Sequence, residues 1–169
     1  MDFVWNKITK LEEVLQATIR VVAAKAQKAR ANVMKRIPHV AIIIENNEGE
    51  ILLLLRDNKS LSLYPNHWTL VGGNVEDGET PETAAHREFA EETGLRADLS
   101  FWKRYDREHP LFIVDEFIYV AKVESPPAAL VLGEGQALQF FKPAEIEGLK
   151  IGYGFKALLN EYFRLPKSL

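Results

Sequence analysis

Residues 73–95, GNVEDGETPETAAHREFAEETGL, decide the fold of this chain and contain most of its candidate chemistry. Thr80 and Pro81 predict the start of a helix, because a Thr hydroxyl caps the first turn and proline suits the first helical position. Residues 84–93 all suit a helix, and Gly94 suits the left-handed residue that ends one. The stretch therefore predicts a loop, a helix and a second loop.

Three glutamates share one face of this predicted helix. Glu88, Glu91 and Glu92 are three and four positions apart, so their side chains are neighbours, and like charges at these spacings weaken a helix. A solvated acidic face is the usual meaning of a charge run, but it does not explain why the glutamates adjoin the glycine pair at 72–73. A hard divalent cation does explain it, because Mg²⁺ or Mn²⁺ takes oxygen ligands and cancels the repulsion.

The same stretch resembles the signature of the Nudix hydrolase superfamily. That signature sets a glycine, a glutamate, an Arg-Glu pair, a bulky residue, a Glu-Glu pair, a glycine and a second bulky residue at fixed spacings. Every position is filled: Gly73, Glu79, Arg87, Glu88, Phe89, Glu91, Glu92, Gly94 and Leu95. Seven of these positions demand one residue type, so chance agreement is on the order of 10⁻⁹ per window.

The resemblance implies a fold and an activity. Family members have an α/β fold, a three-layer α/β/α sandwich with a mixed β-sheet, and the similarity extends over about residues 37–164. They cleave the P–O–P bridge of a nucleoside diphosphate linked to another group. We therefore expect an enzyme, a pyrophosphohydrolase. A non-catalytic nucleotide-sensing module is the alternative, but such modules typically lose signature glutamates and none is lost here.

The resemblance also gives roles to residues of the signature. The ligands of Mg²⁺ or Mn²⁺ would be Glu88, Glu91, Glu92 and the backbone carbonyl of Gly72. The bound cations would neutralise the pyrophosphate and acidify the attacking water. Glu79 and Arg87 would form an ion pair that holds the signature loop against the helix.

Further candidates lie outside the signature. A glutamate on a distal loop often completes such sites as ligand or base, and Glu134, within residues 133–136, resembles it; an ordinary turn acid is the alternative. Base or sugar binding would come from aromatic faces. We predict substrate contacts at Arg56, Tyr64, Phe112 and Tyr153. Trp68 is expected in the core.

Residues 1–36 are predicted to form one long amphipathic helix, followed by the hydrolase domain at 37–169. The segment contains no Gly or Pro, and its apolar residues recur every three or four positions: Ile8, Leu11, Leu15, Ile19, Val22, Ala26 and Val33. Up to residue 38 it contains eight Lys and Arg against three Asp and Glu. Packing on its own domain or a partner subunit, lying on a membrane surface, and contacting nucleic acid are the three alternatives.

Helix packing is favoured, because the stripe is rich in Ala and Val. A helix of about thirty residues is roughly 45 Å long, which exceeds one edge of a domain of this size. We therefore expect a homodimer through this helix.

The rest of the chain reads as short strands and a closing helix. Strands are expected at 39–44, 51–55, 68–71, 99–105, 111–123 and 138–141, a charged turn at 104–109, and a helix at 155–164.

The composition is that of an ordinary soluble globular protein of 169 residues, with 47% hydrophobic and 27% charged residues. The absence of cysteine excludes disulfides and thiolate metal sites. The net charge of −3 makes a nucleic-acid partner unlikely, and no apolar run approaches 18 residues, so no membrane partner is predicted. With no basic or apolar leader at its start, the chain is expected to be cytoplasmic.

The leaving group stays open at this stage. Nucleoside triphosphates are favoured by the compact size and by residues 134–136, and nucleoside diphosphate sugars such as ADP-ribose by Pro110, fifteen residues after the signature. Hydrolysis at the 5′ end of RNA is a third possibility, supported by the basic N-terminal helix.

Overall fold

The computed structural model describes residues 2–59, 63–124 and 130–166. The chain divides into two compact units. The first contains residues 1–36 and 108–113, and the second contains residues 37–107 and 114–169.

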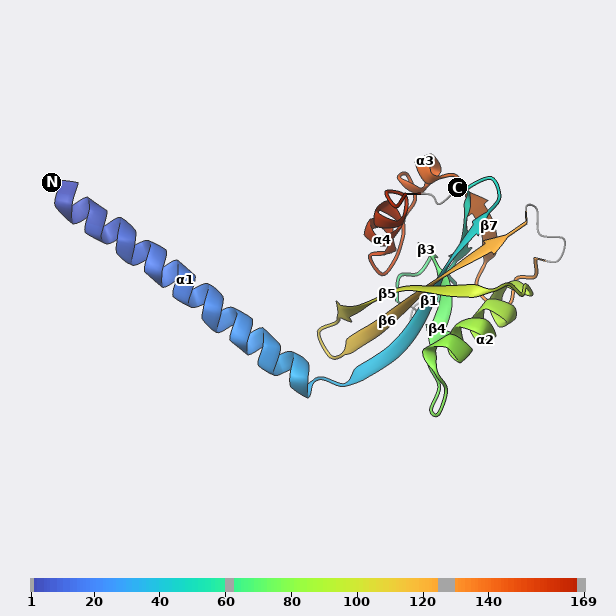
Figure 1. Ribbon diagram of the computed structural model, residues 1–169, viewed down its shortest axis with the longest axis horizontal. Coiled ribbons are helices and arrows are strands. Elements are labelled where there is room, and N and C mark those ends of the chain that lie inside the picture. Colours follow the sequence, from blue (N-terminus) through green and yellow to red (C-terminus); the bar gives the residue numbers. More distant parts are fainter. Residues whose placement is uncertain (1, 60–62, 125–129, 167–169) are drawn as a thin grey trace. The chain divides into compact units, whose positions relative to one another are not determined.

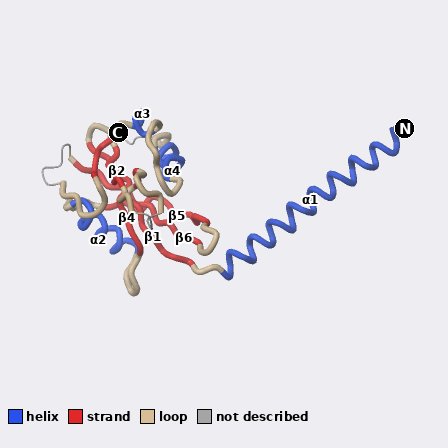
Figure 2. The backbone as a smooth tube through the Cα atoms, turned by 180° about the vertical axis from the view of Figure 1, so that it is seen from behind, coloured by secondary structure: helices blue, strands red, loops and turns tan. Residues whose placement is uncertain are grey.

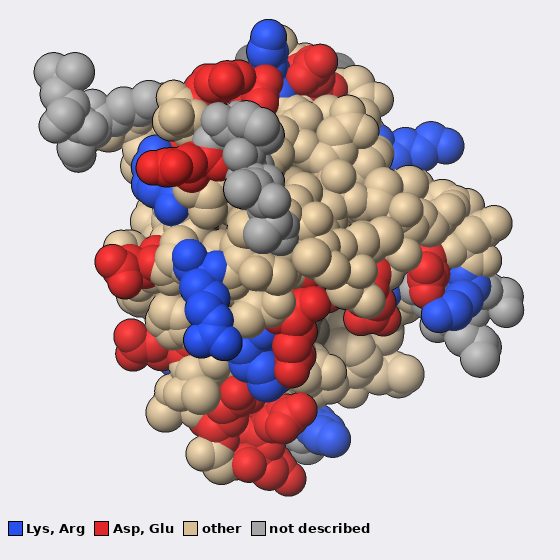
Figure 3. Space-filling model, turned by 90° about the vertical axis from the view of Figure 1, so that its right-hand side faces the viewer, with Lys and Arg blue, Asp and Glu red and all other residues tan. Residues whose placement is uncertain are grey.

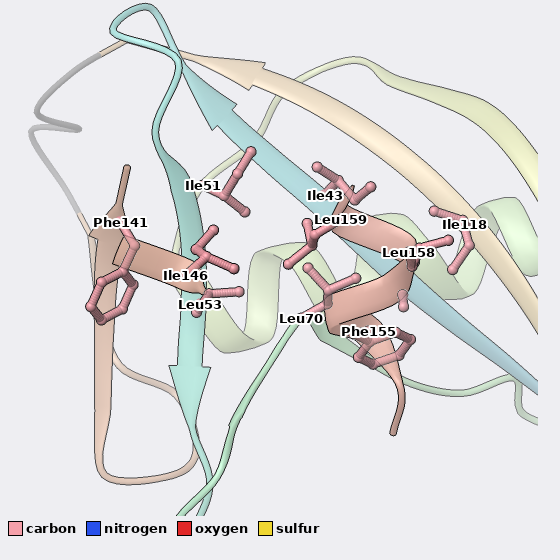
Figure 4. Close-up of a cluster of buried hydrophobic side chains, with 11 residues drawn as sticks. Ile43, Ile51, Leu53, Leu70, Ile118, Phe141, Ile146, Phe155, Leu158 and Leu159 are labelled. Atoms are coloured by element: carbon pink, nitrogen blue, oxygen red, sulfur yellow. The ribbon is translucent and has the colours of Figure 1, made fainter. Parts of the chain in front are cut away.

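The second unit is built on a seven-stranded sheet. Its strands are β1 (Arg36–Asn46), β2 (Ile51–Leu55), β3 (Trp68–Thr69), β4 (Val71–Asn74), β5 (Leu99–Glu108), β6 (Ile113–Val123) and β7 (Ala137–Phe141). The order is β3-β2-β1-β6-β5, with β4 paired to β1 and β7 paired to β2. Strand β1 is antiparallel to β2 and β4, whereas β1 and β6 run side by side in the same direction (Figures 1 and 4). The sheet is therefore mixed, as predicted.

Helices cover both faces of this sheet. Helix α2 (Pro81–Thr93) lies on one face, and α3 (Pro143–Ile146) and α4 (Phe155–Tyr162) lie on the other, as the views from the front and from behind show (Figures 1 and 2). This arrangement confirms the three-layer α/β/α sandwich.

Each interface between sheet and helices has its own apolar core. Under α4, the sheet residues Ile43, Leu53 and Ile118 meet Phe155 and Leu159 (Figure 4). Under α2, Ile42, Leu52 and Val71 pack with Ala85 and Phe89. Neighbouring residues of β1 and of β2 thus contribute to opposite cores, because side chains alternate across a strand. The two cores explain why both strands are apolar without interruption.

Helix α2 has the ends that its sequence predicts. The Thr80 hydroxyl accepts a hydrogen bond from the Thr83 N–H, Pro81 opens the helix, and Gly94 ends it with φ +70°. Because these local signals set where the helix begins and ends, they also determine that Glu88, Glu91 and Glu92 lie on one helix, three and four positions apart.

The charged turn expected at 104–109 was wrong, because β5 continues to Glu108. Two arginines in this part of β5 pair with carboxylates of β6: Arg104 with Asp115, and Arg107 with Glu116. The charges therefore join the two strands instead of marking a turn. The short helix α3 was not predicted, and Leu70 divides the strand expected at 68–71 into β3 and β4.

The first unit contains helix α1 (Asp2–Val33), which was expected as one long helix. The middle of this helix has five exposed apolar side chains: Val14, Leu15, Ile19, Val21 and Val22. Across the described residues, no helix combines the length and the apolar character needed to cross a membrane.

Candidate active site

Helix α2 presses its glutamates against the glycines of β4. The Glu88 carboxylate lies so close to Gly73 that a Cβ on this glycine would meet Oε1 at 2.2 Å. Only a residue without a side chain allows this approach. The glycine and the glutamate of the signature therefore form one contact between strand and helix.

Arg87 connects the signature loop to the helix. Its Nε and Nη2 donate to the Glu79 carboxylate at 3.1 and 3.0 Å, and Nη2 also donates to the Asn74 carbonyl at 3.0 Å. Nη1 donates to Glu88 at 2.6 Å and to Glu91 at 3.2 Å. Hydrogen bonds to Glu79 and Glu88 raise the pKa of Arg87, and the bond from Arg87 lowers the pKa of Glu79. One guanidinium therefore fixes the loop and orients two signature carboxylates.

Glu92 is the buried member of the set, with 6% of its surface exposed. Its Oε2 accepts a hydrogen bond from the Gly72 N–H at 3.1 Å. Burial, together with the charges of Glu88 and Glu134, raises the pKa of Glu92 to about 7, although the bond from the Gly72 N–H opposes this rise. Three carboxylates from two parts of the chain therefore act on each other electrostatically.

A loop after β6 brings Glu134 to this place. Val131 N–H donates to the Thr93 carbonyl at 2.8 Å, and Gly133 N–H donates to the Glu92 carbonyl at 3.2 Å. A Cβ on Gly133 would lie 2.0 Å from the Glu91 carbonyl oxygen, so the loop contacts the end of α2 without a side chain between them. The loop thus holds Glu134 beside the helix that bears the other glutamates.

The donor set suits a hard divalent cation. The charges of Glu88 and Glu134 act on Glu92, carboxylate oxygens are the ligands that Mg²⁺ and Mn²⁺ prefer, and the sequence has no cysteine for a softer metal. As the side chains are arranged, no three His, Asp or Glu within the described ranges converge on one point. Glu88 and Glu91 are turned to Arg87 instead. Metal binding would therefore require these carboxylates to turn, and the metal-binding roles of Glu88, Glu91, Glu92 and Gly72 stay predictions.

A second cluster contains three of the four predicted substrate contacts. The Tyr64 and Tyr153 rings lie edge to face with centroids 4.8 Å apart, and the Arg56 guanidinium lies 5.3 Å from the Tyr153 centroid. Gln136, two residues after Glu134, donates to the Arg56 carbonyl at 2.6 Å, so this cluster lies near the loop of Glu134, and the charge of Arg56 lowers the pKa of Glu92. We name Arg56, Tyr64, Arg107 and Tyr153 the tyrosine cluster.

Backbone strain is concentrated at the tyrosine cluster. Among the described residues, those other than glycine with positive φ are Tyr64 (+57°), Asn66 (+55°) and Tyr153 (+59°). Such conformations cost about 1–3 kcal/mol each and gather at functional sites. The surrounding structure maintains them: Gln136 donates to Asn66, and Tyr153 donates to the Leu63 carbonyl.

Sequence reasoning missed a charged group behind the tyrosine cluster. Glu116 is fully buried, and its carboxylate binds His39 Nδ1 at 2.7 Å and Arg107 at 2.9 and 3.0 Å. Arg107 in turn lies 4.9 Å from the Tyr153 centroid. The only signal in the sequence is an acidic pair, Asp115 and Glu116, inside an apolar strand.

Phe112 belongs to the first unit, where its ring stacks on His109 with centroids 4.1 Å apart, and its predicted contact with substrate stays a prediction. Trp68 packs edge to face on Phe141, at the core, as expected. On the face drawn in Figure 3, basic side chains lie in small separate groups among acidic ones, and acidic side chains gather at the lower edge, so that face shows no continuous basic patch of the kind that binds nucleic acid.

The model of the NUDIX domain matches residues 35–159. This chain therefore belongs to the Nudix hydrolase family, a family of enzymes. An uncharacterised Nudix hydrolase of Listeria innocua is 28% identical over 171 residues, which cover 97% of this chain and 95% of that protein. Among solved structures, the MutT protein from Methanosarcina mazei has a TM-score of 0.69 at 22% identity and covers 80% of this chain and 99% of that one, which supports the fold.

A part of the chain is also similar to an RNA pyrophosphohydrolase of Aeromonas hydrophila. The two are 42% identical over 62 residues, 36% of this chain. The match spans 31% of that protein's length.

Proposed function

We propose that this chain is a pyrophosphohydrolase that depends on Mg²⁺ or Mn²⁺ and cleaves a nucleoside diphosphate linked to another moiety. The proposal rests on one observation: Glu92 is buried at the Gly72 N–H, within reach of the charges of Glu88 and Glu134. A buried carboxylate among like charges is unfavourable unless a cation joins it. Nucleoside triphosphates and nucleoside diphosphate sugars such as ADP-ribose are the candidate substrates.

The residues of the site would have different roles in metal binding, positioning and substrate binding. Glu88, Glu91 and Glu92, with the Gly72 carbonyl, would bind the cation, and Glu134 would serve as a further ligand or as the base. A bound Mg²⁺ supplies charge neutralisation and a more acidic water. Arg87 and Glu79 keep the loop against α2, so the glutamates stay in place. Arg56, between Glu92 and Tyr153, suits a phosphate, and Tyr64 and Tyr153 suit the nucleoside.

A substrate panel tests this proposal. The panel contains nucleoside triphosphates, diphosphate sugars and 5′-triphosphorylated RNA, and product analysis should find a nucleoside monophosphate. Chelation should abolish turnover, Mg²⁺ or Mn²⁺ should restore it, and Ca²⁺ should support binding more than turnover, since it is larger and less strict in geometry. Terminal orthophosphate as the sole product, or full activity in the chelated protein, would contradict the proposal.

Matched variants locate the activity on one face of α2. Glu92→Gln or Glu91→Gln should lower kcat by at least about a hundredfold, because each removes charge from the cation site. Glu82→Gln, at the exposed start of the same helix, is the control and should leave turnover unchanged. A folded Glu92→Gln variant with full activity would show that the carboxylates are not the site.

RNA 5′-end hydrolysis is the second candidate. The similarity to the Aeromonas hydrophila RNA pyrophosphohydrolase and the basic residues of the N-terminal segment favour it. The triphosphorylated RNA in the panel decides between RNA and free nucleotides. Product formation in that panel also separates an enzyme from a nucleotide-sensing module.

We also propose a homodimer formed through α1. Its exposed apolar residues Leu15, Ile19 and Val22 follow one another at steps of four and three positions, which places them near one another along the helix, and Val14 adjoins Leu15. Each such side chain contributes about 1.5–3 kcal/mol when buried, so a few of them would sustain a stable contact.

A further inference from the structure

Arg107 on β5 is held by a buried carboxylate of the neighbouring strand β6. Its Nε and Nη2 both donate to Oε2 of Glu116, and the other carboxylate oxygen binds His39 on β1. Glu116 is fully buried, whereas about a fifth of the Arg107 side chain remains exposed. The buried carboxylate of Glu116 therefore fixes a guanidinium that also lies over the Tyr153 ring.

The bonds to Glu116 determine what Arg107 can recognise. They use Nε and Nη2, and no residue in the described ranges accepts a hydrogen bond from Nη1. The charge of the guanidinium is balanced by Glu116, so Arg107 is less suited to a phosphate than Arg56, whose charge already acts on Glu92. Nη1 and the second N–H of Nη2 are left as donors of fixed orientation, and the guanidinium has no acceptor atom.

The neighbours of Arg107 indicate an aromatic ligand. Its guanidinium lies 4.9 Å from the Tyr153 centroid, and Tyr64 completes an edge-to-face pair with that ring. Gly152 lies against Tyr64, where a Cβ would be 3.1 Å from the ring. Tyrosine and arginine surfaces bind nucleobases by stacking. The Tyr153 hydroxyl donates to the Leu63 carbonyl at 3.3 Å, and this bond together with the edge-to-face contact restrains the two rings.

We propose that Arg107, positioned by Glu116, reads the nucleobase and selects guanine over adenine. This inference rests on the proposed function, because it assumes a nucleotide beside the glutamates. Guanine presents two neighbouring acceptors, O6 and N7, whereas adenine presents an acceptor next to a donor. Nη1 and the second N–H of Nη2 form two neighbouring donors of fixed orientation, which match O6 and N7 of guanine but not the acceptor and donor of adenine. A good two-bond contact of this kind is worth about 10- to 100-fold in discrimination.

Binding of GMP and AMP to the full-length chain tests the proposal without turnover. Calorimetry should find that GMP binds about 10- to 100-fold more tightly than AMP. Arg107→Lys keeps a positive charge beside buried Glu116 but loses the planar fork, and it should lose this preference. Glu116→Gln should weaken the preference as well. Equal binding of GMP and AMP to the unaltered chain would overturn the proposal.

The chain offers a matched control on the same two strands. Arg104 and Asp115 form a second arginine–carboxylate pair between β5 and β6, with both bonds at 2.5 Å, and this pair contacts Phe117 instead of the tyrosine cluster. Asp115→Asn should therefore keep the preference for GMP. If Asp115→Asn also removes the preference for GMP, the effect belongs to the β5–β6 hairpin as a whole. If Arg107→Lys retains the preference, the guanidinium does not read the base. Either result overturns the proposal.

Kinetics separate this inference from the proposed function. With GTP and ATP in Mg²⁺, Arg107→Lys should raise KM for GTP about 10- to 100-fold while kcat changes little, since the base is remote from the reacting bond. If the unaltered chain hydrolyses neither nucleotide, hydrolysis of triphosphates is excluded, and the GMP and AMP titrations still decide the role of Arg107. A fall in kcat for both nucleotides without a change in KM would contradict the role in base recognition.

Discussion

The carboxylate of Glu88 occupies the space in which a side chain of Gly73 would begin, with Oε1 2.2 Å from the ideal Cβ position. The two residues are fifteen positions apart in sequence, and β4 and α2 bring them together. Any side chain at position 73 must therefore displace the carboxylate.

Gly73→Ala should lower activity about a hundredfold, because a displacement near 1 Å at the reacting groups has that effect. The melting temperature should change by a few degrees at most if the glutamate turns away. Gly148→Ala is the control, since a Cβ there meets its nearest atom, the Glu145 carbonyl oxygen, at 3.6 Å. Turnover and thermal unfolding of both variants check the prediction. Normal turnover in Gly73→Ala would mean that Glu88 need not hold its observed position.

Arg87→Lys should lower kcat about 10- to 100-fold, as is typical when a group that orients metal ligands is lost. Lysine keeps the charge but lacks the fork that binds Glu79 through two nitrogens while contacting Glu88 and Glu91. Lys103→Gln, which removes the exposed ion pair with Glu161, should change neither rate nor stability appreciably. Equal rates for the two variants would contradict the orienting role of Arg87.

Glu116→Gln should destabilise the fold in a pH-dependent way. Burial acts to raise the pKa of Glu116, but His39 and Arg107 outweigh it and lower the pKa below its ordinary 4.5. A carboxyl with a lowered pKa stabilises the folded state above its unfolded value, and this contribution is lost as pH falls through the folded value. Near neutral pH the variant should lose about 1.5–3 kcal/mol.

Urea unfolding of both proteins between pH 7 and pH 3 measures this difference. It should be constant above about pH 5 and shrink below pH 4.5. A difference that persists unchanged at pH 3 would show that the ionised carboxylate is not what stabilises the fold.

The double substitution Leu15→Lys with Ile19→Lys should convert the proposed dimer into a monomer, because two charges would enter the apolar contact. Gln16→Lys, an exposed position between them, is the control and should leave the dimer intact. Removal of residues 1–36 should likewise give a monomer, or an aggregation-prone domain, with its glutamates in place. Light scattering gives the mass of each, and a monomeric unaltered chain at micromolar concentration would refute the dimer.

Local signals made α2 predictable in detail. Thr80, Pro81 and Gly94 act on the residues next to them, so their meaning does not depend on the rest of the fold. The strands β1 and β2 were also recognised, because uninterrupted apolar residues suit strands covered on both faces.

Contacts between distant residues explain what sequence reasoning missed. Residues 104–107 looked like a turn because their partners, Asp115 and Glu116, follow nine to eleven positions later on the next strand. The tyrosine cluster joins residues from positions 56 to 153, and Glu116, which binds Arg107 of this cluster, also binds His39 on β1, so no spacing in the chain indicates the arrangement.

The loop that contacts the end of α2 bears on how the protein is made. Gly133 donates to the carbonyl of Glu92, forty-one positions earlier, and Tyr153 lies further towards the C-terminus. During synthesis, the signature helix leaves the ribosome well before the residues that hold Glu134 beside it. A contact of such sequence separation forms late in folding. The growing chain would therefore have a complete signature helix before Glu134 can join the proposed site.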